Sequence, residues 1–151
     1  MQELCVMDNY DARILDELLA NGRLSWSALA KRVNLSASAC QRRAEALIER
    51  GVIDNFTVNL NDAARGYAVR AFVSVNVDRQ HNELAVEFRE AVLAHANVER
   101  CHMLSGTIDF MLEVVAEDLV AFGEFINGEL LTMPAVKDAS SSIVLEVVKR
   151  S

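Results

Sequence analysis

One segment restricts the possible folds of this chain more than any other: residues 23–53, RLSWSALAKRVNLSASACQRRAEALIERGVI. The segment predicts two short amphipathic helices joined by a tight turn, and the second helix carries basic and small polar residues on its outward face. Two helices in this arrangement form a helix-turn-helix, in which the second helix enters the major groove of DNA. The pattern therefore predicts a DNA-binding domain.

Capping and turn residues mark the ends of both helices. Ser25 can cap the first helix and Ser36 the second, because their hydroxyls can accept from open N–H groups of the first turn. Asn34 suits the left-handed conformation that the turn between them needs, and Gly51 suits the end of the second helix. The buried stripes are expected to contain Leu29, Val33, Cys40, Ala44 and Leu47.

Another helix is predicted upstream, over residues 8–20. Asp8 or Asp11 can start it, and Asn21-Gly22 is a stop signal. Its apolar stripe is expected to contain Ile14, Leu15, Leu18 and Leu19. Since one apolar stripe is not stable alone, three helices are expected to share one small core.

The distribution of charge separates this region from the rest of the chain. The whole chain of 151 residues has a net charge of −7, although DNA-binding proteins are usually basic. Residues 21–53 contain six Lys and Arg against two Glu, a local charge of +4, whereas residues 66–151 contain seven basic and thirteen acidic residues, a charge of −6. Because the local field decides DNA affinity, the acidic surplus belongs to a second module and does not oppose DNA binding.

Composition favours a folded cytoplasmic protein. Apolar residues make up 52% of the chain and there is one proline. No window approaches the roughly 18 apolar residues of a membrane span, and the N-terminus lacks the features of a signal peptide. Cys5, Cys40 and Cys101 are expected to be reduced thiols, and no Cys or His spacing predicts a zinc site, a metal or a cofactor.

A second module is predicted after a connector. Residues 52–60, VIDNFTVNL, are expected to form a short strand, and the boundary is placed between residues 1–65 and 66–151. From Ala68 the apolar period becomes two, which predicts a strand with one buried face. That face is expected to contain Val69, Ala71, Val73, Val75 and Val77.

The remaining elements complete a β-α-β-β-α-β order. Helices are predicted over about 82–95, with Leu84, Phe88 and Val92, and over about 118–131, with Leu119, Phe122, Ile126 and Leu130. Strands are predicted over 98–104, 108–116 and 141–148. The order predicts a ferredoxin-like domain with two helices on one face of an antiparallel sheet. Apolar Phe72, Val144 and Val148 are expected on the open face, where a partner subunit is the natural cover.

Three stretches resemble a known family: LDELLANGRLS (15–25), LAKRVNLSASACQRRAEALIERGVI (29–53) and CHMLSGTIDFML (101–112). With their order and spacing, the chain resembles the Lrp/AsnC (feast/famine) transcription regulators of bacteria and archaea from residue 7 to 150. The resemblance implies an α+β fold, with an N-terminal winged helix-turn-helix domain followed by a ferredoxin-like (RAM-type) effector and oligomerisation domain. It also implies dimers, often tetramers or octamers, and amino-acid effectors bound between subunits.

Two departures from that family concern its sites. The family commonly has prolines near the start of its recognition helix, where this chain has Ala37 and Ala39. It often carries an acid after the hairpin glycine, where this chain has Thr107. The second departure bears on effector identity, because that turn would contact a zwitterionic ligand.

The hairpin around Gly106 has two interpretations. In the structural one, Gly106 supplies a positive φ and Asp109 caps or pairs locally. In the functional one, which the resemblance favours, N–H groups of the turn bind a carboxylate and the acid attracts an ammonium group. The effector-binding candidates are Met103, Ser105, Gly106, Thr107, Ile108, Asp109, Leu119, Leu131 and Ser142.

The DNA-binding candidates fall into two groups. Ser38, Gln41 and Arg42 are expected to meet base edges, because Gln can bind adenine and Arg can bind guanine in bidentate fashion. The other candidates are expected to contact phosphates or lie on the same outward face; they are Ser25, Trp26, Lys31, Arg32, Ser36, Arg43 and Arg50. Trp26 is equally consistent with a packing role. A dimer would present two such helices to a pseudo-palindromic operator in double-stranded DNA.

Two rival functions are an enzyme and a DNA-binding protein without an effector. Cys101-His102 could suggest an enzyme with a nucleophile and a base, but neighbours on a strand point to opposite faces, so no enzyme is predicted. The second rival is an architectural, nucleoid-associated DNA-binding protein without an effector.

Overall fold

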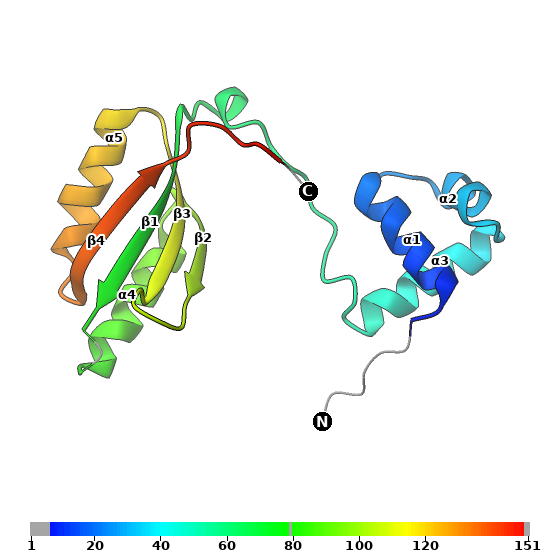
Figure 1. Cartoon of the computed structure of the whole chain (residues 1–151), viewed down its shortest axis with the longest axis horizontal. Coiled ribbons are helices and arrows are strands. Elements are labelled where there is room, and N and C mark those ends of the chain that lie inside the picture. Colours follow the sequence, from blue (N-terminus) through cyan, green and yellow to red (C-terminus); the bar gives the residue numbers. More distant parts are fainter. Residues whose placement is uncertain (1–6, 79, 150–151) are drawn as a thin grey trace. The chain divides into compact units, whose positions relative to one another are not determined.

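The structure, a computed structural model, describes residues 7–78 and 80–149, and the chain folds into two compact units (Figure 1). The first unit ends at Asn59 and the second begins at Leu60. Residues 60–65 therefore lie with the second unit, whereas the sequence placed them with the first.

Three helices form the first unit: α1 (Asn9–Ala20), α2 (Trp26–Val33) and α3 (Ala37–Glu49). Each begins at the expected cap: the side chain of Asp8 accepts from two backbone N–H groups, and the hydroxyls of Ser25 and Ser36 each accept from one. Asn34 ends α2 with φ 59° and ψ 48°, the left-handed conformation predicted for the turn. The sequence thus predicted both ends of the helix-turn-helix correctly.

The core of the first unit lies between these helices. Its buried residues are Ile14, Leu18, Leu29, Ala30, Val33, Cys40 and Leu47. The stripe predicted for α1 was wrong at one position, because Leu19 is 81% exposed. The two partner helices cover only one side of α1, and Leu19 lies about 100° around the helix from buried Leu18. Asp11 is buried instead, although no apolar pattern marks it.

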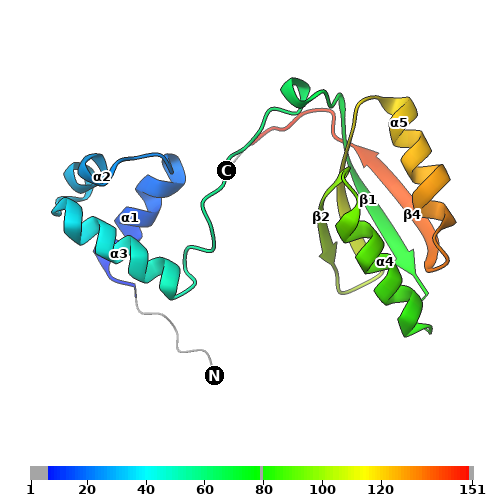
Figure 2. The ribbon, with the colours of Figure 1, turned by 180° about the vertical axis from the view of Figure 1, so that it is seen from behind.

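The second unit has the predicted ferredoxin-like order. Its elements are η1 (Ala63–Arg65), β1 (Val69–Val77), α4 (Asn82–Ala94), β2 (Val98–Met103), β3 (Phe110–Ala116), α5 (Leu119–Glu124), η2 (Phe125–Glu129), η3 (Leu130–Thr132) and β4 (Val136–Ile143). The four strands are antiparallel in the order β2-β3-β1-β4. Figure 2 shows α4 and α5 on the same face of the sheet.

The core of this unit lies between the sheet and its helices. The alternating apolar residues of β1, from Val69 to Val77, are all buried, as predicted. Phe88 of α4 is 1% exposed, and its ring centroid lies 5.1 Å from that of Phe110 on β3. Burial of such aromatic rings contributes much of the stability of a small core.

Two predicted strands differ from the structure. Residues 52–60 form no strand, because no described segment supplies a backbone ladder for them. The last strand is β4, whereas the sequence predicted 141–148. β4 is an edge strand that pairs only with β1, so it tolerates the polar residues Lys137, Asp138 and Ser140. The apolar alternation of residues 141–148 was therefore misleading. Val144 and Val148, expected on the open face, follow the strand.

The second predicted helix of this domain is interrupted. α5 passes into the π-helical segment η2 and then the 3-10 turn η3 before Met133-Pro134. The change of period accompanies the burial of Phe125, which is 2% exposed, whereas Leu119, the first residue of α5, is 62% exposed. Of the predicted stripe, Phe122 and Leu130 are buried and Leu119 is not.

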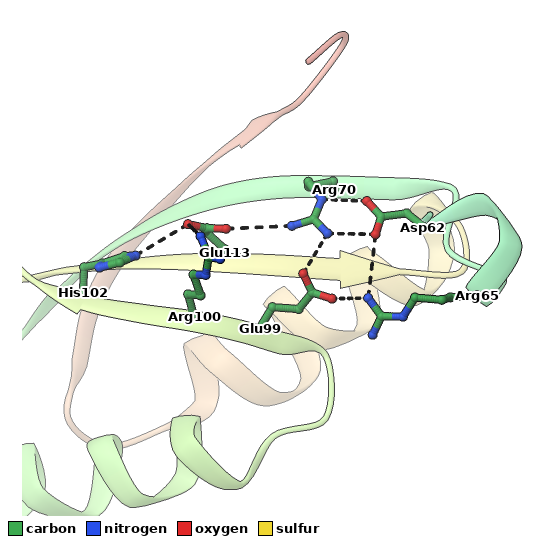
Figure 3. Close-up of polar contacts among 7 residues, drawn as sticks. All are labelled: Asp62, Arg65, Arg70, Glu99, Arg100, His102 and Glu113. Carbon is green, nitrogen blue, oxygen red and sulfur yellow. Dashed lines mark hydrogen bonds and ion pairs between the residues drawn. The ribbon is translucent and has the colours of Figure 1, made fainter. Parts of the chain in front are cut away.

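A polar network connects the start of the second unit to its sheet (Figure 3). Arg70 of β1 donates to both carboxylate oxygens of Asp62, at 2.7 and 2.8 Å, and to Glu99 at 2.7 Å. Arg65 of η1 also donates to Glu99. The network continues to Glu113, which Arg100 and His102 approach from β2 at 3.7 and 3.5 Å. Residues 62–65 are thereby held on the sheet.

The network changes the acidity of its members. Burial alone would raise the pKa of Glu99, but hydrogen bonds and charges from Arg65 and Arg70 outweigh it, and its pKa is lowered from 4.5. The hydrogen bond with Asp62 is the largest reason that the pKa of Arg70 is raised. The charged forms of both side chains are therefore stabilised in the folded state.

Truncation of Phe88 tests the core. Phe88→Ala should lower the free energy of unfolding by about 3–5 kcal/mol, because it removes a fully buried ring beneath the sheet. Urea unfolding at a fixed protomer concentration measures this. Glu90→Ala on the exposed side of α4 is the control and should change stability by less than about 0.5 kcal/mol. Similar losses in both variants would show that Phe88 does not hold the core.

The polar network predicts how stability depends on pH. Because the pKa of Glu99 is lower folded than unfolded, its stabilising contribution is present above pH 4.5 and is lost as the pH falls through the folded-state pKa. Glu99→Gln should therefore reduce stability at pH 7 by about 1–3 kcal/mol and flatten its fall below pH 4.5. Thermal unfolding between pH 3 and 7 measures this. Glu117→Gln, an exposed change without ion pairs to described residues, should keep the wild-type profile.

Candidate DNA-binding surface and effector pocket

The outward face of α3 carries the predicted base-contacting residues. Ser38, Gln41 and Arg42 are all exposed. Gln41 Nε2 donates to Glu45 Oε1 at 2.8 Å, and the hydroxyl of Ser38 lies 3.2 Å from that of Ser36, the capping residue. Because this face is not packed against α1 or α2, it can approach another surface along the N-terminal half of the helix.

The candidates on α2 have mixed environments. Ser25 caps the helix, and Trp26 is half-buried and packs against the core. Lys31 is exposed. Arg32 is also exposed, but its Nη1 lies 2.7 Å from Glu17 Oε2 on α1. An exposed ion pair of this kind is weak, so Arg32 can exchange its carboxylate partner for a phosphate at little cost.

Arg43 and Arg50 lie beside α1 and not with the other candidates. Arg43 Nη1 is 2.7 Å from Asp11 Oδ1 and 2.8 Å from Asp8 Oδ2, and the guanidinium lies 5.5 Å from the ring centroid of Tyr10. Arg50 Nη1 is 3.8 Å from Asp11 Oδ2. The sequence had grouped both arginines with the outward face of the helix.

In the second unit, a pocket of about 520 Å³ lies between the hairpin after β2, the end of β1 and α4. Its lining residues are Val77, Ala85, Arg89, Met103, Leu104, Ser105, Gly106, Asp109 and Phe110. Four of the predicted effector residues, Met103, Ser105, Gly106 and Asp109, are among them. The volume is typical of small-molecule sites.

The other predicted effector residues lie elsewhere. Thr107 and Ile108 belong to the same hairpin but do not line the pocket. Leu119, Leu131 and Ser142 are exposed residues of α5, η3 and β4, and Ser142 is opposite Phe72 in the sheet. The structure therefore does not bring these three side chains into the pocket of their own chain.

The hairpin is held by its own polar contacts. Gly106 has φ 130°, which few residues with a side chain can adopt. Asp109 is 8% exposed, and its Oδ2 accepts from the backbone N–H of Val77 at 2.9 Å. The backbone N–H of Asp109 donates to Asn76 Oδ1 at 3.2 Å. Asp109 thus has the local structural role considered for it and also lines the pocket.

Sequence reasoning missed the contribution of α4 to this pocket. Ala85 and Arg89 lie one turn apart, one position after Leu84, which packs against the core, and Phe88, which is buried in it. Residues four apart share a face of a helix, so Ala85 and Arg89 lie together beside the core-facing side of α4. The alternation of β1 could also have placed Val77 at the pocket, because that residue ends the strand facing the helices.

The two described cysteines are packing residues. Burial raises the pKa of the Cys40 thiol, and also that of Cys101, so both favour the neutral form. Cys101 packs against the core of the second unit, while His102 is exposed on the other face of β2 near Glu113. The pair therefore lacks the geometry of a nucleophile and its base. The third cysteine, Cys5, lies outside the described residues.

No helix within residues 7–78 and 80–149 combines the length and apolar character that crossing a bilayer requires. The described side chains also contain no group of three or more His, Cys, Asp or Glu residues that could hold a metal ion.

Comparison with known proteins agrees with both halves of this description. Residues 70–151 match the Lrp/AsnC ligand binding domain, and residues 7–54 match a winged helix-turn-helix DNA-binding family. The proline dehydrogenase transcriptional activator of Rhizobium radiobacter is 32% identical over 145 residues, which cover 96% of this chain and 93% of that protein.

Solved structures show the same relationship. The crystal structure of a transcriptional regulator from Neisseria meningitidis in complex with L-Met has a TM-score of 0.91 and 32% identity, covering 97% of this chain and 94% of that one. The feast or famine regulatory protein of Mycobacterium tuberculosis, complexed with L-methionine, has a TM-score of 0.84 and 29% identity, covering 96% of both chains. The chain therefore belongs to the Lrp/AsnC family of DNA-binding transcriptional regulators, which are not enzymes.

Proposed function

We propose that this regulator binds a pseudo-palindromic DNA operator as a homo-oligomer and responds to an amino acid with an apolar side chain. The observation that carries the effector half of this proposal is the pocket of about 520 Å³ beside the Gly106 hairpin. Two relatives of similar structure have been solved with L-methionine, an amino acid of this kind.

The DNA half of the proposal rests on the exposed face of α3. Ser38, Gln41 and Arg42 contact base edges in the major groove, and Arg42 is the candidate for a bidentate contact with guanine. Ser25, Trp26, Lys31, Arg32 and Ser36 contact phosphates and set the register of the helix on the duplex. Ser25 and Ser36 are suited to this because both stand at helix N-termini, where a phosphate is favoured.

The lining of the pocket suits a zwitterion with an apolar side chain. Arg89 supplies a positive charge for the carboxylate, together with backbone N–H groups of the hairpin. Asp109 supplies negative charge for the ammonium group while it holds the hairpin to β1. Met103, Leu104 and Phe110 offer apolar surface to the effector's side chain. Met103 is 75% exposed in the single chain, so it can also contact a ligand that a neighbouring subunit covers.

Assembly follows from the uncovered apolar surface of the second unit. Phe72 on the open face of the sheet is 41% exposed, and Leu119 and Leu131 are 62% and 42% exposed. A dimer that associates further into tetramers or octamers would cover such surfaces. An effector bound between subunits can change DNA binding only if it binds two assembly states with different affinity. Because the target is chromosomal DNA, the proposed place of action is the nucleoid, in the cytoplasm of a bacterial or archaeal cell.

Arg42→Ala tests the DNA half of the proposal. The change should weaken binding by about 1–3 kcal/mol and relax the preference at one base position, because it removes one bidentate base contact. The probe is the duplex that the wild-type protein selects from a random pool, and binding is measured for all single-base variants of it. Equal weakening on every variant would assign Arg42 to the phosphate backbone.

A thermal-shift screen against the twenty amino acids tests the effector half. We expect stabilisation by at least one amino acid with an apolar side chain. Arg89→Ala should then lower the affinity for that amino acid by about ten- to hundredfold, because one charge-assisted contact is lost. Arg23→Ala, which removes an exposed arginine of the first unit, is the control and should bind as wild type. Stabilisation by none of the twenty would favour the architectural DNA-binding alternative.

A further inference from the structure

We propose that Asp11 is a positioning residue for DNA recognition: through Arg43 it fixes the orientation of α3 on α1. Arg43 then serves the geometry of the recognition helix and does not contact a phosphate. This inference rests on the proposed role of α3 in the major groove, and it assigns to α1 a part in specificity.

The contacts of Arg43 define the cluster. Its Nη1 donates to Asp11 Oδ1 at 2.7 Å and to Asp8 Oδ2 at 2.8 Å. Its guanidinium also lies over the ring of Tyr10, with 5.5 Å between Cζ and the ring centroid. All three partners stand in the first turn of α1 or at its cap, so one side chain of α3 contacts α1 in three ways.

The arrangement follows from the helical period of α3. Cys40, Ala44 and Leu47 form its buried stripe. Arg43 is three residues after Cys40 and four before Leu47, and Arg50 lies two turns further on. Both arginines therefore flank the stripe on the same side of the helix, where Asp11 lies between α1 and α3. Arg42 lies about 100° away from this edge and is exposed.

The burial of Asp11 makes this contact difficult to exchange. The side chain of Asp11 is 8% exposed, whereas that of Arg43 is 30% exposed and that of Asp8 is 49% exposed. A carboxylate removed from water needs a paired cation and hydrogen bonds. If Arg43 turned to a phosphate, Asp11 would lose its closest partner while remaining inside the protein. The exposed Arg42 can meet DNA without that cost.

The acidities of the cluster agree with this geometry. The pKa of Arg43 is raised above its usual value, chiefly by the hydrogen bond with Asp11 and then by that with Asp8. The pKa of Asp8 is lowered, first by the backbone N–H of Asp11 and, against its desolvation, also by Arg43. The charged forms of Arg43 and Asp8 are therefore favoured in the folded state.

The test compares Arg43→Gln and Asp11→Asn with Arg42→Gln as the matched control, all in the full chain. Affinity is measured over a range of salt concentrations for the selected duplex and for an unselected duplex of equal length. The single tryptophan of the chain, Trp26, reports by its fluorescence the folded fraction at the assay temperature, so that affinities refer to folded protein.

We expect Arg43→Gln and Asp11→Asn each to reduce the ratio of selected to unselected affinity by about tenfold, the effect of losing one charge-assisted pair. Neither should reduce the slope of log K against log salt, and the double variant should be no worse than either alone, because the two residues act as one unit. Arg42→Gln should relax one base position, and its effect should add to that of Asp11→Asn.

Two results would overturn the proposal. In the first, Arg43→Gln lowers the salt slope by about one, as the loss of a phosphate contact does. In the second, Asp11→Asn keeps the wild-type ratio or binds more tightly. If the proposed function fails, the result is different: the wild-type protein itself shows no preference for its selected duplex. The salt slope on unselected DNA would then still decide whether Arg43 contacts phosphate.

Discussion

The alternation of buried and exposed residues along β1 is the constraint on which the second unit depends. β1 is hydrogen-bonded on both sides, to β3 and to β4. Its register therefore places both of these strands directly, and β2 through β3. Its inward valines pack against α4 and the helical segments 119–132, and its outward residues form part of the open face. A shift by one residue would exchange these two sets and bury Arg70 in the core.

In the first unit, polar contacts between helices help to fix how the elements pack. Three short helices bury few large residues, and α1 is tied to its neighbours by Glu17–Arg32 and by the pairs of Asp8 and Asp11 with Arg43. The basic residues of this unit are therefore of two kinds. Exposed ones such as Lys31 and Arg42 raise the local potential, whereas Arg43 is partly neutralised by α1. A simple count of charges overstates the field that DNA would meet.

Much of this could be predicted from local patterns, and the errors have common causes. Caps at Ser25 and Ser36 and the turn at Asn34 act within a few residues, so sequence reasoning was right about them. The strand predicted for residues 52–60 was wrong because alternation alone supplies no pairing partner. Of the pocket proposed for the effector, sequence reasoning named only the hairpin side. Arg89 comes from α4, and the contact of that helix with the hairpin depends on the tertiary fold. Burial of Asp11 likewise required the third helix.

The two ends of β1 carry different attachments. At its last residue, the backbone N–H of Val77 is held by Asp109 of the pocket hairpin, while near its start Arg70 grips Asp62, just after the connecting segment. Nine residues of strand span about 30 Å, and a strand paired on both sides hardly stretches. β1 is thus a stiff strand with the hairpin attached at its last residue and Asp62, which follows residues 52–60, attached near its start. A displacement that moved β1 along its axis would therefore move both attachments together, the hairpin at Val77 and Asp62 at Arg70.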